Sequence, residues 1–332
     1  MLKYIFFLML LAILVTAVSR ADELSVDNTR IQNYSERMKN FYNLDENQQY
    51  RDVTDEVLAS PDTHLDAKDS IRAFHRRIFI FKYPSDGLEV KGFISFTPEA
   101  TYQPLEILFR GGNQDFGLLN PGDSFATFQN VTVISSTLRG GVSQGQDEFG
   151  KADLADIKNM LDYLPTLEHE LGIQLTPRYT FALGESRGAA EMFLALAHYP
   201  ELQEKVNSLV SLSGLLDLEA TIAEREDMRQ MFVDDFGYQP GVNDAEWINP
   251  RNPMNAISNI QPTLPILVIH GSADIRIGAE SGRRFVQKLE ANGNPTTYWE
   301  IDKASHSFNG HPDLMALILH WTEQNSITRT YP

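Results

Sequence analysis

The chain of 332 residues contains no cysteine. Disulfide bonds, thiolate nucleophiles and zinc sites with thiolate ligands are therefore excluded. The sequence also has no metal signature, dinucleotide-binding loop or cofactor-binding lysine motif, so we expect no cofactor. A domain without disulfides depends on its hydrophobic core, and apolar residues make up 42% of this chain, which is enough for a sizeable one.

Basic residues are scarce: 28 Lys and Arg stand against 45 Asp and Glu, giving a net charge of −17 at pH 7. A surface this negative repels phosphate backbones and anionic lipids, so we expect no nucleic-acid partner. The same charge helps an exported protein to stay soluble. Composition does not indicate an oligomeric state.

Long hydrophobic runs are absent except at the N-terminus, where a hydrophobic stretch of fifteen residues runs from Tyr4 to Val18. Lys3 precedes this run and small residues follow it, the layout of a secretory signal peptide, so we predict residues 1–21 as the signal. An uncleaved anchor helix is the alternative, but a full span needs about 20 apolar residues. We therefore expect an exported protein, periplasmic or secreted, without membrane association after cleavage.

Residues 22–70 are polar, lack glycine and are too few for an independent domain. We predict a helical extension, with helices around 30–42 and 50–59, packed on the domain that follows. A different pattern begins at residue 71 and continues to residue 332.

In this second part short apolar strands alternate with helical patterns. An antiparallel hairpin over 77–96 is expected first, because turn residues separate two β-prone segments. Further strands are expected at 105–109, 131–136, 179–183, 208–212, 266–269 and 296–301, and helices at 147–164, 187–197, 279–290 and 313–324. The alternation predicts an α/β fold with a doubly wound, mostly parallel sheet and helices on both faces.

A longer connection at about 215–263 contains several aromatic and methionine residues among many acids. Connections of this length are often lids or substrate-binding loops. The alternative is a helical insertion whose apolar residues only anchor it to the core.

The strongest motif is Gly184-Glu185-Ser186-Arg187-Gly188, which follows an apolar strand and leads directly into a helical segment. This context is typical of the nucleophile elbow of the α/β-hydrolase fold, in which the glycines permit close approach of strand and helix. Ser186 is therefore the predicted nucleophile.

A serine nucleophile needs a base and an acid, and in this fold they follow it in the order acid, then His. Asp274 follows the strand at 266–269 and is the predicted acid, with Asp217 as the alternative. His306 lies in a loop after the last strand and is the predicted base. The other late histidines are His311, placed at a helix entry, and His320, placed inside the last helix.

The oxyanion of the tetrahedral intermediate needs donors. One is expected to be the backbone N–H of Arg187, and the second is expected from the loop 110–117, which contains Gly112 after Arg110. Two other groups are predicted to be structural. His270 closes the end of its strand, and Arg139 forms an ion-pair network with Asp147, Glu148 and Asp153 rather than a substrate site.

Several of these features together resemble the catalytic domain of the prolyl oligopeptidase family of serine peptidases, in the family's order. They are the hairpin with Ser85-Asp86-Gly87-Leu88, the Gly111-Gly112 loop, Arg139-Gly140-Gly141, Asp147 to Gly150, the elbow, His270-Gly271 with Asp274, and His306. The resemblance runs from about residue 71 to the C-terminus and implies a serine peptidase.

Two departures from the family pattern affect the predicted substrate. The resemblance implies a β-propeller before the catalytic domain in the gated members, and the residues before 71 are too few for one. It also implies a tyrosine before the Gly-Gly pair, where this chain has Arg110, which could bind the oxyanion, bind a substrate carboxylate or form a structural ion pair. We predict peptide hydrolysis through Ser186, Asp274 and His306, with a peptide or small acyl substrate. Ester hydrolysis is the alternative, and a non-catalytic binding protein is a third.

Overall fold

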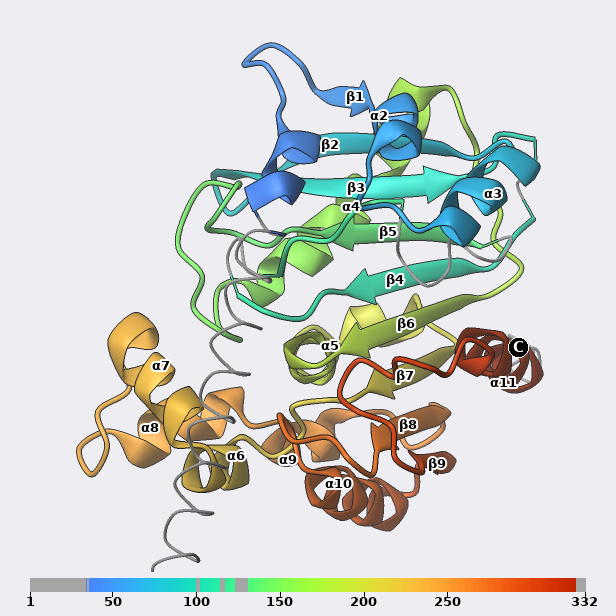
Figure 1. Ribbon diagram of the computed structural model, residues 1–332. Coiled ribbons are helices and arrows are strands. Elements are labelled where there is room, and N and C mark those ends of the chain that lie inside the picture. The colour runs from blue at the N-terminus through green and yellow to red at the C-terminus, as the bar shows by residue number, and fades with distance from the viewer. Residues whose placement is uncertain (1–33, 35, 100–101, 114–116, 123–130, 327–332) are drawn as a thin grey trace, which may run out of the picture.

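The computed structural model describes residues 34, 36–99, 102–113, 117–122 and 131–326. The predicted signal peptide lies outside these residues. Within them, nine strands form a single sheet in the order β1-β2-β3-β5-β4-β6-β7-β8-β9 (Figure 1). The strands are β1 (Tyr50–Asp52), β2 (Arg77–Ser85), β3 (Leu88–Phe96), β4 (Leu105–Phe109), β5 (Thr132–Ser136), β6 (Thr180–Glu185), β7 (Ser208–Leu212), β8 (Ile266–Gly271) and β9 (Thr296–Ile301).

The sheet is antiparallel at one end and parallel over the rest. β1, β2 and β3 pair antiparallel, and β3 pairs antiparallel with β5. All pairs from β5 to β9 are parallel. The central strands β4 to β8 are almost wholly buried, as expected for parallel strands covered on both faces.

Helices cover the sheet on both faces (Figure 1). They are α2 (Thr54–Ala59), α3 (Leu65–Ala73), α4 (Leu154–Leu171), α5 (Arg187–His198), α6 (Leu218–Glu224), α7 (Glu226–Phe236), α8 (Asp244–Ile248), α9 (Pro253–Ala256), α10 (Ala279–Asn292) and α11 (Leu314–Ser326), with short 3₁₀ turns at Lys39–Tyr42, Pro200–Glu204, Asn249–Arg251 and Ile257–Asn259. One core lies between the sheet and α4, α5 and α10. The other lies between the sheet, α11 and the N-terminal helices. The predicted α/β-hydrolase class is thus confirmed.

The N-terminal extension is only partly helical over the residues that the structure describes, 34 and 36–70. Residues 50–52, predicted as the start of a helix, form β1 and pair with β2. The helix α2 starts later because the Asp52 carboxylate accepts hydrogen bonds from the backbone N–H and the hydroxyl of Thr54, at 2.8 and 2.6 Å. Apolar side chains of the extension, including Met38 and Val57, are fully buried in the second core.

The helix predicted from residue 147 begins at Leu154 instead. The carboxylate of Asp153 accepts hydrogen bonds from the backbone N–H groups of Gly150 and Lys151 at 2.9 and 2.6 Å. Residues 147–153 are therefore held as a turn before α4. The helix then continues through Pro165 and ends at Leu171, where it is capped by Gly172 with a left-handed φ of 65°.

The connection 215–263 folds as the helices α6 to α9 with a small core of its own. Phe232, Tyr238 and Trp247 are buried there, together with Phe149 from the turn before α4. These aromatic residues anchor the insertion to the rest of the domain. Among the described residues no helix has the length and apolarity needed to span a membrane.

Candidate active site

Ser186 occupies the sharp turn between β6 and α5. Its φ of 54° and ψ of −120° lie in a region that non-glycine residues rarely adopt. Two backbone hydrogen bonds hold the residue there: its N–H donates to the Leu212 carbonyl at 2.9 Å, and its carbonyl accepts from the Leu215 N–H at 3.0 Å. The serine is partly exposed at the carboxyl edge of the sheet, where ligands bind in open α/β folds.

The motif requires glycine at 184 and 188 because neighbouring backbone lies very close to both residues. A Cβ on Gly184 would lie 2.5 Å from the Cα of Ala189, and a Cβ on Gly188 would lie 1.9 Å from the carbonyl oxygen of Phe109. No side chain fits at either distance. The elbow is thus packed directly against the end of β4.

The structure brings the three predicted catalytic side chains into one hydrogen-bonded row. His306 Nε2 lies 3.0 Å from Ser186 Oγ, and His306 Nδ1 lies 2.7 Å from Asp274 Oδ2. The Asp274 side chain is fully buried, whereas that of His306 is 13% exposed. This is the arrangement in which an imidazole can accept a serine proton while a carboxylate fixes its tautomer.

Asp274 is held in its ionised form by its hydrogen bonds. Burial alone would raise the pKa of its carboxyl, but the bond from His306 and the backbone N–H groups of Ile277 and Arg276 outweigh burial and lower the pKa. These N–H groups donate to Oδ1 at 3.0 and 2.8 Å, leaving Oδ2 for His306.

The alternative residues have other partners. Asp217 caps α6 through a bond from the Ala220 N–H at 3.1 Å and pairs with Arg284 at 3.0 Å. His311 accepts from the Leu314 N–H at the entry to α11, and His320 within α11 bonds to Gln324.

His270 is fully buried at the end of β8, as expected for a structural residue. Its Nε2 lies 3.0 Å from the Ile277 carbonyl oxygen, and burial lowers the pKa of the imidazole. A neutral ring that donates from Nε2 fits this environment.

The predicted oxyanion loop lies beside the nucleophile, although its residues 114–116 are outside the described part of the chain. Gly111 rather than Gly112 is the glycine that approaches the nucleophile, because a Cβ on Gly111 would lie 3.3 Å from Ser186 Cβ. Gly112 has a φ of 67°. The backbone N–H of Arg187 is at the first turn of α5, where it has no partner within the helix.

Arg110 is buried, and its guanidinium is bonded to backbone carbonyls. Nε and Nη2 donate to the Thr137 carbonyl at 2.8 and 2.6 Å, and Nη1 donates to the Gly111 carbonyl at 3.2 Å. The side chain therefore ties the end of β4 to the end of β5. Of the three roles considered for Arg110, these contacts favour a structural one, although through carbonyls rather than an ion pair.

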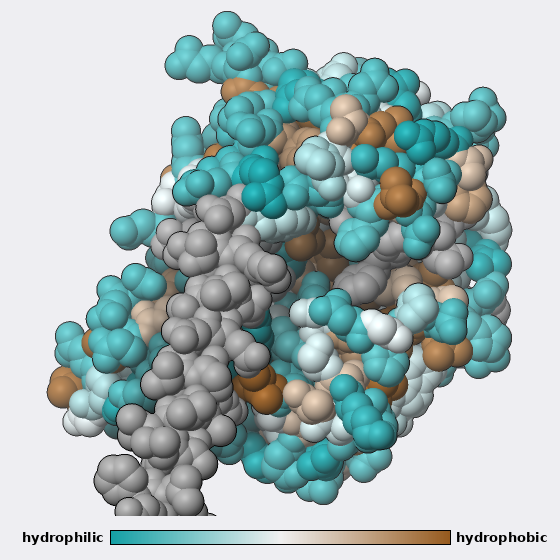
Figure 2. All heavy atoms as spheres, viewed as in Figure 1, coloured by the Kyte–Doolittle hydropathy of each residue, from teal (hydrophilic) through white to brown (hydrophobic). Residues whose placement is uncertain are grey.

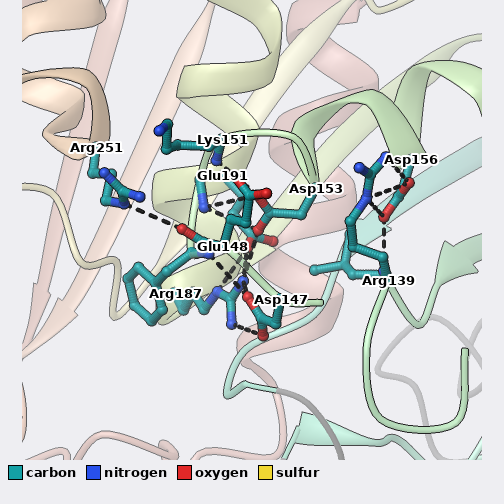
Figure 3. A network of polar contacts seen from close by, with 12 residues as sticks. Arg139, Asp147, Glu148, Lys151, Asp153, Asp156, Arg187, Glu191 and Arg251 are labelled. Atoms are coloured by element: carbon teal, nitrogen blue, oxygen red, sulfur yellow. Dashed lines mark hydrogen bonds and ion pairs between the residues drawn. The ribbon is translucent and has the colours of Figure 1, made fainter. Parts of the chain in front are cut away.

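The predicted network of Arg139 has different members. Arg139 pairs with the buried Asp156 at 2.8 Å and with Asp86 at 2.9 Å, not with the acids at 147, 148 and 153. Figure 3 shows this pair apart from a second cluster that contains Asp147 and Asp153. The prediction of an ion-pair network was correct in kind but wrong in its partners, because Asp147 and Asp153 lie in the turn before α4 and pair with Arg187 instead.

The centre of the second cluster is the side chain of Arg187, which sequence reasoning missed. Its guanidinium bonds to Asp147, Asp153 and Glu191 (Figure 3). Glu191 follows Arg187 by four residues on α5, and this i,i+4 spacing was the available signal. Within the described part of the chain, no group of three or more His, Asp or Glu side chains is arranged to hold a metal ion.

Comparison with known proteins indicates the family of the chain. The model of the prolyl oligopeptidase family matches residues 127–327, more than half of the chain. "Uncharacterized peptidase YtmA" of Bacillus subtilis is 27% identical over 239 residues, which are 70% of this chain and 88% of that protein. "Dipeptidyl peptidase family member 6" of Caenorhabditis elegans is 25% identical over 214 residues, 60% of this chain but 27% of that protein.

Two solved structures show the same fold. The acylaminoacyl peptidase of Pyrococcus horikoshii aligns with a TM-score of 0.63 at 18% identity, over 76% of this chain and 42% of that one. Est1E from Butyrivibrio proteoclasticus aligns with a TM-score of 0.52 at 16% identity, over 75% of this chain and 100% of that one. This chain therefore matches less than half of the archaeal peptidase and the whole length of Est1E.

Proposed function

Because this chain belongs to the prolyl oligopeptidase family of serine hydrolases, we propose that it cleaves peptide bonds through an acyl-enzyme formed on Ser186. The observation that carries the proposal is the hydrogen-bonded row of Ser186, His306 and Asp274 at a strained elbow. A fixed, partly exposed hydroxyl with a base at 3.0 Å supports nucleophilic attack.

The proposed reaction has two halves. As Ser186 Oγ attacks the substrate carbonyl carbon, His306 Nε2 takes the hydroxyl proton and then gives it to the leaving amine as the C–N bond breaks. Water enters, loses a proton to the same nitrogen and attacks the acyl carbon. The bond between that carbon and Ser186 Oγ then breaks, His306 returns the proton to Oγ, and the carboxylic acid leaves. Asp274 keeps the ring in its tautomer and stabilises the imidazolium in both halves.

The negative oxygen of each tetrahedral intermediate needs hydrogen-bond donors. We propose the backbone N–H of Arg187 as one and an N–H of the 111–113 segment as the other, since Gly111 lies directly against Ser186. Removing one such donor typically costs about 100- to 1,000-fold in kcat.

A second candidate is hydrolysis of carboxylic esters by the same steps. The contacts of Arg110 favour ester hydrolysis. Arg110 stands where the resembled family has a tyrosine, and its guanidinium is bonded to the Thr137 carbonyl, so this position supplies no hydroxyl to the oxyanion. An ester needs less activation than an amide, because its alkoxide leaves more readily than an amine.

Labelling with a fluorophosphonate probe tests the nucleophile. We expect the wild type to be labelled and Ser186→Ala to remain unlabelled. Ser305→Ala is the matched control, because this exposed serine lies next to His306 and its loss should leave labelling unchanged. A folded wild type without label, or undiminished labelling of Ser186→Ala, would contradict the proposal.

Turnover then separates the two candidate substrates. We expect N-acyl dipeptide nitroanilides to be cleaved, and cleavage to be lost in Ser186→Ala. Turnover of short acyl nitrophenyl esters without any turnover of the amides would favour the second candidate.

A further inference from the structure

The guanidinium of Arg187 lies in a position that connects the two predicted oxyanion donors. It is buried directly behind the elbow, with 3% of the residue exposed. Its Nη1 donates to the Gly112 carbonyl oxygen at 3.2 Å. One residue therefore carries a predicted donor on its backbone and, through its side chain, contacts the loop expected to supply the second.

Three acidic side chains fix this guanidinium from the other sides. Asp147 binds it with both oxygens, each at 2.6 Å, and Asp153 accepts from Nη2 at 2.9 Å. Glu191 accepts from Nε at 2.6 Å. A planar guanidinium with so many fixed partners has a single orientation, so its bond to Gly112 is directed and not incidental.

The face of the guanidinium is covered by an aromatic ring. Arg187 Cζ lies 4.2 Å from the centre of the Phe149 ring. That ring packs edge-on against Phe232 and Phe236 of α7, at 4.9 and 5.2 Å between ring centres. The ring excludes water from the ion pairs, which strengthens them.

We propose that the Arg187 side chain is a positioning residue for the oxyanion site, holding the 111–112 backbone at a fixed distance from the first turn of α5. This inference rests on the proposed function, because it assigns a role in stabilising the tetrahedral intermediate. A lysine at this position could pair with one carboxylate but could not also keep the bidentate bond and the bond to Gly112.

The proposed role of Arg187 predicts which kinetic constant changes when its side chain is replaced. Backbone donors aimed at the developing oxyanion act in the transition state more than on the bound substrate, so their displacement lowers kcat and leaves KM nearly unchanged. A purely structural role of Arg187 would lower thermal stability without changing kcat per folded active site.

The test compares Arg187→Lys with Arg139→Lys in the full chain. Arg139 is the matched control because it is also a buried arginine paired with a fully buried aspartate, in a separate cluster. With active sites counted by fluorophosphonate titration, we expect Arg187→Lys to lower kcat on nitrophenyl butyrate about 10- to 100-fold. We expect Arg139→Lys to change kcat less than 2-fold.

A trifluoromethyl ketone inhibitor gives an independent readout, because its adduct with serine places an oxyanion in the same site. Its inhibition constant should rise in Arg187→Lys by a factor similar to the fall in kcat. A variant with wild-type kcat and wild-type inhibition constant overturns the inference.

Two further outcomes are informative. If Arg187→Lys shows no cooperative melt, Asp147→Asn replaces it: a fall of several-fold in kcat supports the inference, and an unchanged kcat overturns it. A folded wild type that takes no label and turns over neither ester nor amide overturns the proposed function, and the inference falls with it.

Discussion

Buried charge is concentrated around a few residues behind the nucleophile. The guanidinium of Arg187 pairs with the carboxylates of Asp147 and Asp153, and the nearby Arg110 interacts electrostatically with Asp147. Glu191 is a third acidic residue of this cluster and is bonded to Arg187. Burial raises the pKa of its carboxyl to about 8, with Arg187 opposing this rise and the two aspartates adding to it.

This pKa predicts how the stability of the protein depends on pH. Between about pH 4.5 and 8 the folded protein keeps a proton on Glu191 that the unfolded chain releases, so the free energy of unfolding falls by up to about 1.4 kcal/mol per pH unit. Glu191→Gln keeps the acceptor for Arg187 but cannot titrate. In urea unfolding, the stability of this variant relative to the wild type should increase from pH 5.5 to 8 and then stay constant. A difference independent of pH would show that Glu191 is ionised in the folded protein.

At the scale of elements, the junction of β4, β6 and α5 sets the position of the elbow. A prediction follows for Gly188→Ala, because the added methyl group would lie 1.9 Å from the Phe109 carbonyl oxygen and strand or helix must move. We expect a loss of about 3 kcal/mol in unfolding free energy, at the upper end of typical overpacking costs, and a large loss of activity.

Gly278→Ala is the control for this prediction. Gly278 has a φ of −64°, and nothing lies within 4 Å of an added Cβ. We expect a change of less than about 1 kcal/mol, measured by the same thermal or urea unfolding. Equal effects of the two substitutions would mean that the close approach at Gly188 does not determine the packing.

Some elements could be predicted from the sequence and others could not. The parallel strands are short, continuous apolar runs because they are buried on both faces, so their positions were predictable. The start of α4 was not, because the Asp153 carboxylate takes the backbone N–H groups that an earlier helix would have used internally. The elbow motif indicated Ser186, and the chain order of the fold indicated Asp274 and His306, which the structure brings into hydrogen-bonding distance. The contacts of the Arg187 side chain join distant segments, which periodicity does not reveal.

At the scale of the whole molecule, one face of the surface can be compared with the composition. On the face shown in Figure 2, outside the grey atoms, hydrophobic residues appear mostly singly or in small groups among hydrophilic ones. Such scattered residues are normal for a protein surface and do not indicate a docking site. The net charge of −17 is consistent with this surface.

At this scale we propose that the protein is exported, with its first 21 residues removed. Intact-mass measurement of the protein recovered from the culture medium or periplasm should then give a chain that begins at Asp22. A chain that retains Met1 and sediments with membranes would instead favour the anchor helix, since the run from Tyr4 to Val18 would remain attached.

The short strand β1 has a consequence for how the folded protein avoids self-association. By pairing with residues 79–81 it covers part of the outer edge of β2, a nine-residue strand that would otherwise offer its unpaired N–H and C=O groups to another chain. A shortened chain that lacks the residues before β2 would leave that edge uncovered. The extension thus shortens the unpaired edge of the sheet that another chain could pair with.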